Sequence, residues 1–187
     1  MKYRTLGKTN LRVSVIGVGT WQLGGEWGKD FSQDEVNQML ARALDLGINL
    51  IDTAECYGDH TSESLIGQAI AAGRDRWILA TKFGHKFHSH MNRTDERSPQ
   101  DIAQQLEASL RALRTDYIDL YQWHSVRDSE FLNEDAWAVL QKAKQAGKIR
   151  HVGNSIGSND NIVQTDASTQ ADVEAIQVIY NRLDRTP

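Results

Sequence analysis

The stretch NLIDTAECYGDH, residues 49–60, joins an apolar strand to two ionisable side chains. It opens with an apolar run around the β-branched Ile51, and a carboxylate, Asp52, stands where that run ends. Tyr57 follows in the next loop, directly before Gly58. An acid at the end of a buried strand, with a phenol just beyond it, indicates that the hydrophobic core ends here and that a functional site begins. Polar side chains at the ends of other predicted strands are the candidate partners of this pair.

The alternation of apolar strand and amphipathic helix repeats along the chain. Ser32 with Glu35 forms a capping box, Gly47 ends the helix that follows, and Ser98 before Pro99 is typical of another helix start. The predicted strands span residues 13–19, 48–52, 77–83, 117–124, 149–155 and 174–181, after a hairpin over 2–14. The predicted helices span residues 32–47, 62–73, 98–113, 133–146 and 159–168.

Strict alternation of strands and helices predicts an α/β fold with parallel strands and right-handed crossovers. A doubly wound sheet and a (β/α)8 barrel both satisfy it. The doubly wound sheet should carry a glycine-rich nucleotide fingerprint after its first strand, but GVGTWQLGG has Gln22 where the third glycine belongs, after Gly17 and Gly19. The pattern therefore favours the barrel, with about six strand–helix units in this chain.

Polar side chains end four successive predicted strands. Asp52, Lys82, His124 and Ser155 occupy these positions, and Tyr57 comes from the loop after Asp52. Each has an ordinary structural interpretation: a loop carboxylate, a lysine that snorkels to the surface, a core histidine, a half-buried tyrosine. In a β/α barrel, however, the carboxyl ends of the strands form one face, and active sites lie there. We therefore expect these side chains to meet.

The chemistry of such a set is carbonyl reduction. A free phenol has a pKa near 10, and a nearby ammonium is expected to lower it by stabilising the phenolate. A carboxylate would hold the lysine in place, and an imidazole would orient a carbonyl oxygen through a hydrogen bond. The set would protonate an oxygen as it gains negative charge. Since no side chain supplies a hydride, a nicotinamide cofactor is implied.

The sequence resembles the aldo-keto reductases, which are NAD(P)H-dependent barrels. The matching motifs run through the whole chain: LGKTNLRVSVIGVGTW, GINLIDTAECYG, ILATKFG, SLRALRTDYIDLYQWH, AGKIRHVGNS and IQVIYNRLDR. The resemblance implies a catalytic tetrad of Asp52, Tyr57, Lys82 and His124, with Tyr57 as the general acid. It also implies cofactor contacts from Thr20, Trp21, Asp52, Ser155 and Gln177. The expected cofactor is NADP(H), with NAD(H) as the alternative, and the expected partner is a small-molecule carbonyl substrate.

Two departures from the family pattern shape these expectations. VGNSIGSND places Ile156 where the family often has an asparagine, so Asn154 and Ile156 are in doubt as ligands. The sequence also reaches residue 187 after six predicted strands, so residues 1–187 are expected to form one incomplete barrel domain, with strands seven and eight outside it. A non-catalytic regulatory barrel subunit and an inactive fragment are the alternatives to an enzyme.

Composition bounds the remaining possibilities. The net charge of −4, without a basic run, argues against a nucleic-acid surface. One cysteine, Cys56, fits a reducing compartment, and without a leader or a spanning apolar run the expected location is the cytoplasm. His85, His88 and His90 are expected to lie in a flexible polar loop rather than bind a metal. Trp21, Trp27 and Trp123 are expected to wall a substrate pocket, whereas Trp77 and Trp137 are expected to pack helices onto the barrel.

Overall fold

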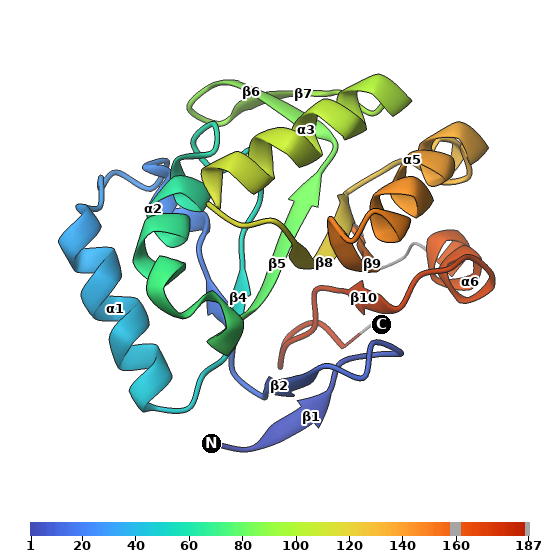
Figure 1. Cartoon of the computed structure of the whole chain (residues 1–187). Helices are drawn as coiled ribbons and strands as arrows, with labels where there is room; N and C mark the ends of the chain where they lie inside the picture. The colour runs from blue at the N-terminus through green and yellow to red at the C-terminus, as the bar shows by residue number, and fades with distance from the viewer. Residues whose placement is uncertain (158–161, 186–187) are drawn as a thin grey trace.

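A curved sheet of six parallel strands forms the centre of the protein, with helices on its convex side (Figure 1). The computed structural model describes residues 1–157 and 162–185. The strand order is β10-β9-β8-β5-β4-β3, so each strand pairs with the next parallel strand along the chain. This is the arrangement of a partial (β/α)8 barrel, as the alternation of elements predicted.

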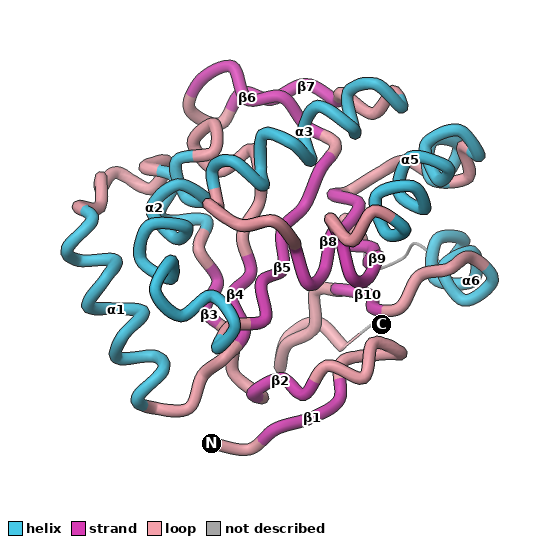
Figure 2. Tube along the Cα trace, in the orientation of Figure 1, coloured by secondary structure: helices cyan, strands magenta, loops and turns pink. Residues whose placement is uncertain are grey.

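The sheet strands are β3 (Val18–Gly19), β4 (Leu50–Asp52), β5 (Ile78–Phe83), β8 (Ile118–His124), β9 (Ile149–Ser155) and β10 (Ala175–Gln177). The main helices are α1 (Gln33–Asp45), α2 (Thr61–Ile70), α3 (Pro99–Ala112), α5 (Glu134–Gln145) and α6 (Ile162–Gln170). Shorter turns of helix are η1 (Trp21–Gly24), η2 (Ala71–Arg76) and α4 (Asp128–Phe131). In Figure 2 the helices lie outside the strands of the sheet.

The predicted helix starts are confirmed by the hydrogen bonds at their caps. In α1 the Ser32 side chain accepts from the Glu35 amide while the Glu35 side chain accepts from the Ser32 amide. The same reciprocal bonds join Ser98 and Asp101 at the start of α3. At α5 the Asn133 side chain accepts from the Ala136 amide. These local bonds are why the sequence located the helices well.

The amino-terminal hairpin is also confirmed. Its strands are β1 (Tyr3–Thr5) and β2 (Arg12–Ser14), paired antiparallel. The Lys8 amide donates to the Glu174 carbonyl at 2.6 Å, which links the hairpin to the segment before β10. The Tyr3 hydroxyl donates to the Gly47 carbonyl at 2.8 Å. The hairpin thus lies across the end of the sheet opposite the carboxyl ends of its strands (Figure 1).

Two predicted strands are shorter than expected. The run VSVIGVG was predicted as one buried strand over 13–19, but it is divided between β2 and the two-residue β3. Val15 and Ile16 between them are 51% and 57% exposed, because the chain leaves the hairpin there before it enters the sheet. The run EAIQVIYN is a strand only over Ala175–Gln177.

A further correction concerns the segment after β5. It was predicted as a flexible polar loop, but it folds as a hairpin of β6 (His85–Ser89) and β7 (Asn92–Asp95), with Met91 in the left-handed region at the turn. Of the predicted weak helix over 159–168, α6 covers the part from Ile162 onward, and residues 159–161 lie outside the described residues. Within the described ranges, no helix is both long and apolar enough to cross a bilayer.

Candidate active site

A buried ion pair at the end of the sheet forms the base of the candidate site. Lys82 of β5 is 1% exposed, and its ammonium donates to both oxygens of Asp52 at 2.8 and 2.9 Å. The same ammonium donates to the Thr53 carbonyl at 2.8 Å. Lys82 points inward because side chains alternate along β5, and its neighbours Thr81 and Phe83 face the helices. It therefore cannot snorkel to solvent, and the structure brings it to Asp52 as predicted.

Tyr57 is held above this pair by close backbone packing. Its hydroxyl lies 3.5 Å from the Lys82 ammonium. Gly58, at φ +65°, and Gly24 of η1 approach so closely that a Cβ on either would overlap the other's loop backbone. The Trp21 ring stacks beside Tyr57 at a centroid distance of 6.0 Å. The loop after β4 is thereby fixed against the loop after β3, which holds the phenol over the ammonium.

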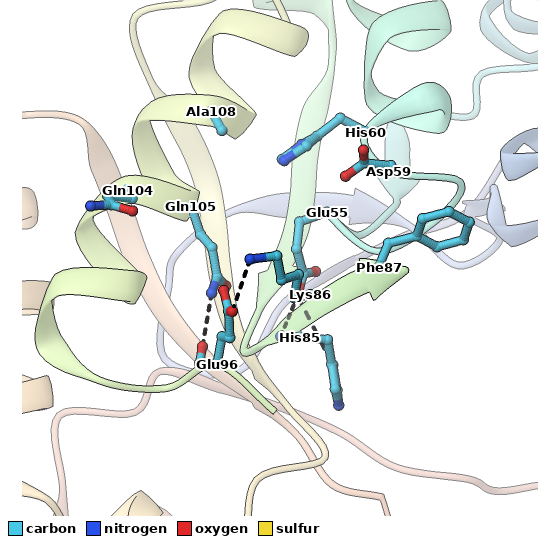
Figure 3. A pocket seen from close by; sticks show the side chains of 10 residues that line it. All are labelled: Glu55, Asp59, His60, His85, Lys86, Phe87, Glu96, Gln104, Gln105 and Ala108. Atoms are coloured by element: carbon cyan, nitrogen blue, oxygen red, sulfur yellow. Dashed lines mark hydrogen bonds and ion pairs between the residues drawn. The ribbon is translucent and has the colours of Figure 1, made fainter. Parts of the chain in front are cut away.

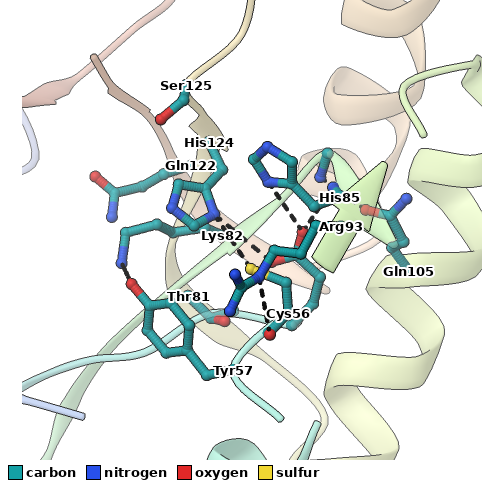
Figure 4. Close-up of polar contacts among 12 residues, drawn as sticks. Cys56, Tyr57, Thr81, Lys82, His85, Arg93, Gln105, Gln122, His124 and Ser125 are labelled. Carbon is teal, nitrogen blue, oxygen red and sulfur yellow. Dashed lines mark hydrogen bonds and ion pairs between the residues drawn. The ribbon is translucent and has the colours of Figure 1, made fainter. Parts of the chain in front are cut away.

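His124 completes the set at the end of β8 (Figure 4). Its ring lies edge-on to Tyr57 with centroids 6.1 Å apart. Its Nδ1 atom lies 3.7 Å from the Cys56 sulfur and 4.0 Å from Oε2 of Glu55. The four residues predicted to meet at the carboxyl ends of the strands thus occupy one rim.

Burial dominates the electrostatics of this rim. Burial raises the pKa of Tyr57 above its ordinary value, and the negative charge of Asp52 adds to the effect. The pKa was expected to be lowered by Lys82, but burial outweighs that effect, and the ammonium is itself bound by both oxygens of Asp52. Burial and the positive charge of Lys82 hold the pKa of His124 well below its ordinary value. At neutral pH the rim therefore presents a protonated phenol and a neutral imidazole.

The residues predicted to contact a cofactor fall into two groups. Gln177 of β10 faces the rim: its amide nitrogen lies 3.4 Å from Oδ2 of Asp52, and its oxygen accepts from Gln122 at 3.2 Å. Ser155 pairs in register with His124 on one side and with Gln177 on the other. Asp52, Gln122 and Gln177 line a cavity of about 340 Å³ on the concave side of the sheet.

Thr20 and Trp21 play different local roles. Thr20 is 1% exposed, and its hydroxyl donates to the Asp52 carbonyl at 2.9 Å while accepting from Ser62 at 3.0 Å. Its hydroxyl is thus used to join β4 to α2. Trp21 borders the open space in front of the phenol, a cavity of about 170 Å³. That cavity is lined by Trp21, Cys56, Tyr57, His85, Arg93 and His124.

Only one of the three tryptophans predicted for a substrate pocket lines this cavity. Trp123 is fully buried on the helix side of β8, against Phe83 and Trp137, so its assignment to a pocket wall was wrong. The alternation along β8 places Trp123 opposite in direction to His124. Trp27 is 56% exposed and meets Trp21 edge-on at 4.9 Å. Trp77, as predicted, is buried in the core between sheet and helices.

Asn154 is turned away from the rim. It is fully buried, and its amide donates to Ser168 of α6 at 3.1 Å and to Gln164 at 3.3 Å. Ile156 is also buried, at 5% exposed. The doubt about both residues as ligands therefore has a structural basis, since neither places a polar group toward the cavity in front of Tyr57.

Sequence reasoning missed the residues that come from the β6–β7 hairpin and its partners. Arg93 of β7 reaches back to donate to the Cys56 carbonyl at 3.3 Å and pairs with Glu26. Glu26, 6% exposed, also accepts from the Met91 amide at 2.9 Å and from the Trp21 indole at 3.2 Å. The hairpin is thereby fastened beside the cavity. Its signal was the alternation in HKFHS and NRTD, which polar side chains concealed.

The family model for the aldo/keto reductase family matches residues 15–187. The chain belongs to this family. Aldo-keto reductase YhdN of Bacillus subtilis (strain 168) is 39% identical over 194 residues, covering 99% of this chain and 55% of that protein. The NADH-specific methylglyoxal reductase of Escherichia coli (strain K12) is 34% identical, covering 99% of this chain and 60% of that protein. The chain thus spans little more than half the length of these relatives.

Solved structures of the family superpose closely on this fold. An aldo-keto reductase from Bacillus halodurans in its holo form has a TM-score of 0.84 at 31% identity, covering 96% of this chain and 58% of that chain. The glycerol dehydrogenase from Gluconobacter oxydans has a TM-score of 0.82 at 34% identity, covering 98% of this chain and 57% of that chain. The partial barrel described above is therefore of the aldo-keto reductase type.

Proposed function

We propose that the protein reduces an aldehyde or ketone to an alcohol with a hydride from NADPH, and that Tyr57 is the general acid. The observation that carries this proposal is the chain of contacts from Asp52 through the buried Lys82 to the Tyr57 hydroxyl, beside His124. Family membership supports the reaction class.

Each side chain has a separate task in this reaction. Tyr57 donates its hydroxyl proton to the carbonyl oxygen as that oxygen gains negative charge. The Lys82 ammonium, 3.5 Å away, stabilises the phenolate that results, and Asp52 holds the ammonium in place. The neutral His124 imidazole donates a hydrogen bond that orients the carbonyl. The raised pKa of Tyr57 keeps the phenol protonated at neutral pH, before the carbonyl oxygen gains charge.

The residues present fit a nicotinamide cofactor, which supplies the hydride when bound. The concave cavity of about 340 Å³ begins at Asp52 and carries the amides of Gln122 and Gln177. These amides, with the Ser155 hydroxyl, offer the donors and acceptors that a carboxamide requires. Trp21 supplies an aromatic wall on the opposite side of Tyr57. We assign cofactor contacts to Trp21, Asp52, Ser155 and Gln177, whereas Thr20, expected as a further contact, is buried and supports Asp52 through its hydroxyl.

The Tyr57→Phe variant tests the mechanism. It should lower the rate of aldehyde reduction by about 10²–10⁴-fold, because it removes the donated proton, while NADPH titration by fluorescence stays unchanged. Tyr180→Phe is the matched control, since Tyr180 is 64% exposed and lines neither of the two cavities beside Tyr57 and Asp52. A Tyr57→Phe protein that reduces aldehydes as fast as the parent would falsify the assignment. NADH is titrated in parallel, because a relative is named as NADH-specific.

The same measurements separate the alternatives. Micromolar NADPH binding with negligible turnover would favour a regulatory barrel subunit. Absence of both binding and turnover would favour an inactive fragment. We further propose one incomplete barrel domain over residues 1–187, a small-molecule substrate and a cytoplasmic location. The single cysteine, buried and unpaired, supports a reducing compartment.

A further inference from the structure

Four side chains of types that commonly bind metals converge at the wall of the candidate active site. Glu55 and Cys56 precede Tyr57 in the chain, His85 begins β6, and His124 ends β8. Figure 4 shows Cys56, His85 and His124 side by side. One ligand atom from each residue lies within 4.8 Å of all the others. Only His124 has a part in the proposed reaction. Glu55, Cys56 and His85 are therefore unexplained by the function.

The distances within this cluster are close to those of a metal site. The Cys56 sulfur lies 3.7 Å from Nδ1 of His124, and Oε2 of Glu55 lies 4.0 Å from the same nitrogen. Nδ1 of His85 lies 4.0 Å from Oε1 of Glu55. Tetrahedral Zn²⁺ with bonds of about 2.0–2.3 Å places its ligand atoms about 3.3–3.8 Å apart. The widest separations in the cluster, up to 4.8 Å, exceed that spacing by about 1 Å, so the side chains would close by about that much around the ion.

A second observation points into the same space. Oε2 of Glu55 and Nδ1 of His85 are both buried without a hydrogen-bond partner, and Glu55 is only 3% exposed. Leaving a buried polar atom unsatisfied costs about 1–3 kcal/mol, so such atoms mark places where a ligand is missing. Glu55 also borders a cavity of about 180 Å³ beside α3 (Figure 3), and His85 lines both this cavity and the one in front of Tyr57.

The positive side chains around the cluster are neutralised by carboxylates other than Glu55, so they do not occupy the place of a cation. The positive side chains nearest the cluster each pair with another carboxylate: Lys82 with Asp52, Arg93 with Glu26, and Arg97 with Glu130. A Glu55 carboxylate and a Cys56 thiolate would balance the charge of a divalent ion. Sulfur and imidazole ligands favour Zn²⁺ over the hard cations Mg²⁺ and Ca²⁺.

We propose that Glu55, Cys56, His85 and His124 form a binding site for Zn²⁺, and that occupancy of this site inhibits the reductase. The Cys56 sulfur bonds to the ion, and its thiol proton leaves to solvent. The ion binds Nδ1 of His124 and lies at the wall of the cavity in front of Tyr57 that Cys56, His85 and His124 form, so it obstructs the carbonyl substrate there. The inhibition, but not the binding, rests on the function proposed above.

The binding is tested on the 187-residue chain stripped of metal. Zn²⁺ is titrated against a chromophoric chelator, and Co²⁺ is used as a spectroscopic probe. We expect one ion per chain and a thiolate-to-cobalt absorption band. Cys56→Ala should abolish the band, and Glu55→Gln and His85→Gln should each weaken Zn²⁺ binding by about 10–100-fold. His90→Gln, an exposed histidine of the same hairpin, is the matched control and should change neither.

Thermal unfolding of each variant shows whether it is folded. The proposal would be overturned if the folded parent protein does not take Zn²⁺ from the chelator. It would also be overturned if Zn²⁺ binding persists in folded Cys56→Ala and His85→Gln but is lost in His90→Gln. Inhibition is measured relative to each variant's own activity and should be reversed by EDTA in the parent. Zinc binding through these residues in a chain without reductase activity would leave the site standing and reject the function. Reductase activity without zinc binding would reject the site alone.

Discussion

The two faces of the parallel sheet are built from the same strands but differ in almost every physical property. The convex face carries Leu79, Tyr121 and Trp123, all fully buried beneath the helices. The concave face carries only small or medium apolar residues, with Ala80, Leu120 and Ala175 forming a minor cluster. The large apolar side chains therefore stabilise the fold on one side of the sheet.

The small side chains of the concave face leave space for a cavity. This face borders a cavity of about 340 Å³, and its polar side chains, such as Asp52 and Gln122, gather toward the carboxyl ends of the strands. Side chains alternate along a strand, so one apolar run serves both faces. Core and site are therefore separated by the direction in which side chains point rather than by their position in the sequence. Four variants test this difference between the two faces.

Leu79→Ala on the convex face should have the largest effect. Leu79 is fully buried in the main core, so removing its side chain leaves a cavity that the helices above cannot fill. We expect a loss of about 4 kcal/mol in the free energy of unfolding, measured by urea denaturation. Leu132→Ala is the control, since Leu132 is 59% exposed and its loss should cost less than about 0.5 kcal/mol.

Asp52→Asn on the concave face should come next. The substitution preserves shape but leaves the buried Lys82 ammonium without its counter-charge, which should destabilise the protein by about 3 kcal/mol in urea unfolding. Asp116→Asn on the surface is the control and should have little effect. Equal stability of the Asp52→Asn and parent proteins would mean that the ion pair does not hold this face together.

Leu120→Ala makes the direct contrast with Leu79→Ala, because the chemical change is identical and only the face differs. Leu120 already borders the concave cavity, so less packing is lost, and we expect about 2 kcal/mol in the same urea experiment. If Leu120→Ala lowers the free energy of unfolding as much as Leu79→Ala does, the two faces are equally well packed and the proposed difference between them is wrong.

The smallest effect concerns His60, which pairs with the buried Glu63 on the helix side. Burial alone would lower the pKa of His60, but the hydrogen bond and charge of Glu63 outweigh it and raise the pKa. A raised pKa gives stability that is complete below the ordinary histidine pKa of about 6.5 and is lost as the pH rises past the folded-state value.

His60→Asn should therefore cost about 1 kcal/mol at about pH 5.5 and almost nothing at about pH 9, by urea unfolding at each pH. Asparagine tolerates the left-handed backbone of residue 60, at φ +65°, so backbone strain is not introduced. A difference that is constant with pH would show that the pair does not titrate as inferred.

Much of the fold followed from local signals. The capping residues Ser32, Ser98 and Asn133 located three helices, since their bonds lie within one helical turn. The polar strand ends predicted that Asp52, Lys82 and His124 would meet, because parallel strands end at one edge of a sheet. The cluster proposed to bind Zn²⁺ was not predicted, because Glu55 lies in the loop after β4, His85 begins β6, and only the folded chain brings them together.

The errors have a common cause. The run VSVIGVG is apolar enough for a strand, but whether it pairs along its whole length depends on where the hairpin turns away from the sheet. The β6–β7 hairpin is polar and gave no apolar period, so its antiparallel pairing is set by contacts such as that of Arg93 with Glu26. Trp123 and His124 are adjacent in sequence, and their opposite roles depend on the direction of each side chain.

The sequence by itself determined the order of strands and helices, the helix caps and the residue types at the strand ends, since these depend on nearest neighbours and on periodicity. Only the tertiary structure decided toward which face each strand residue points, how burial raises the pKa of Tyr57, and which loops meet beside Tyr57. Those properties depend on contacts between residues far apart in the chain. NLIDTAECYGDH contains the acid and the phenol, but the fold places Lys82 between them.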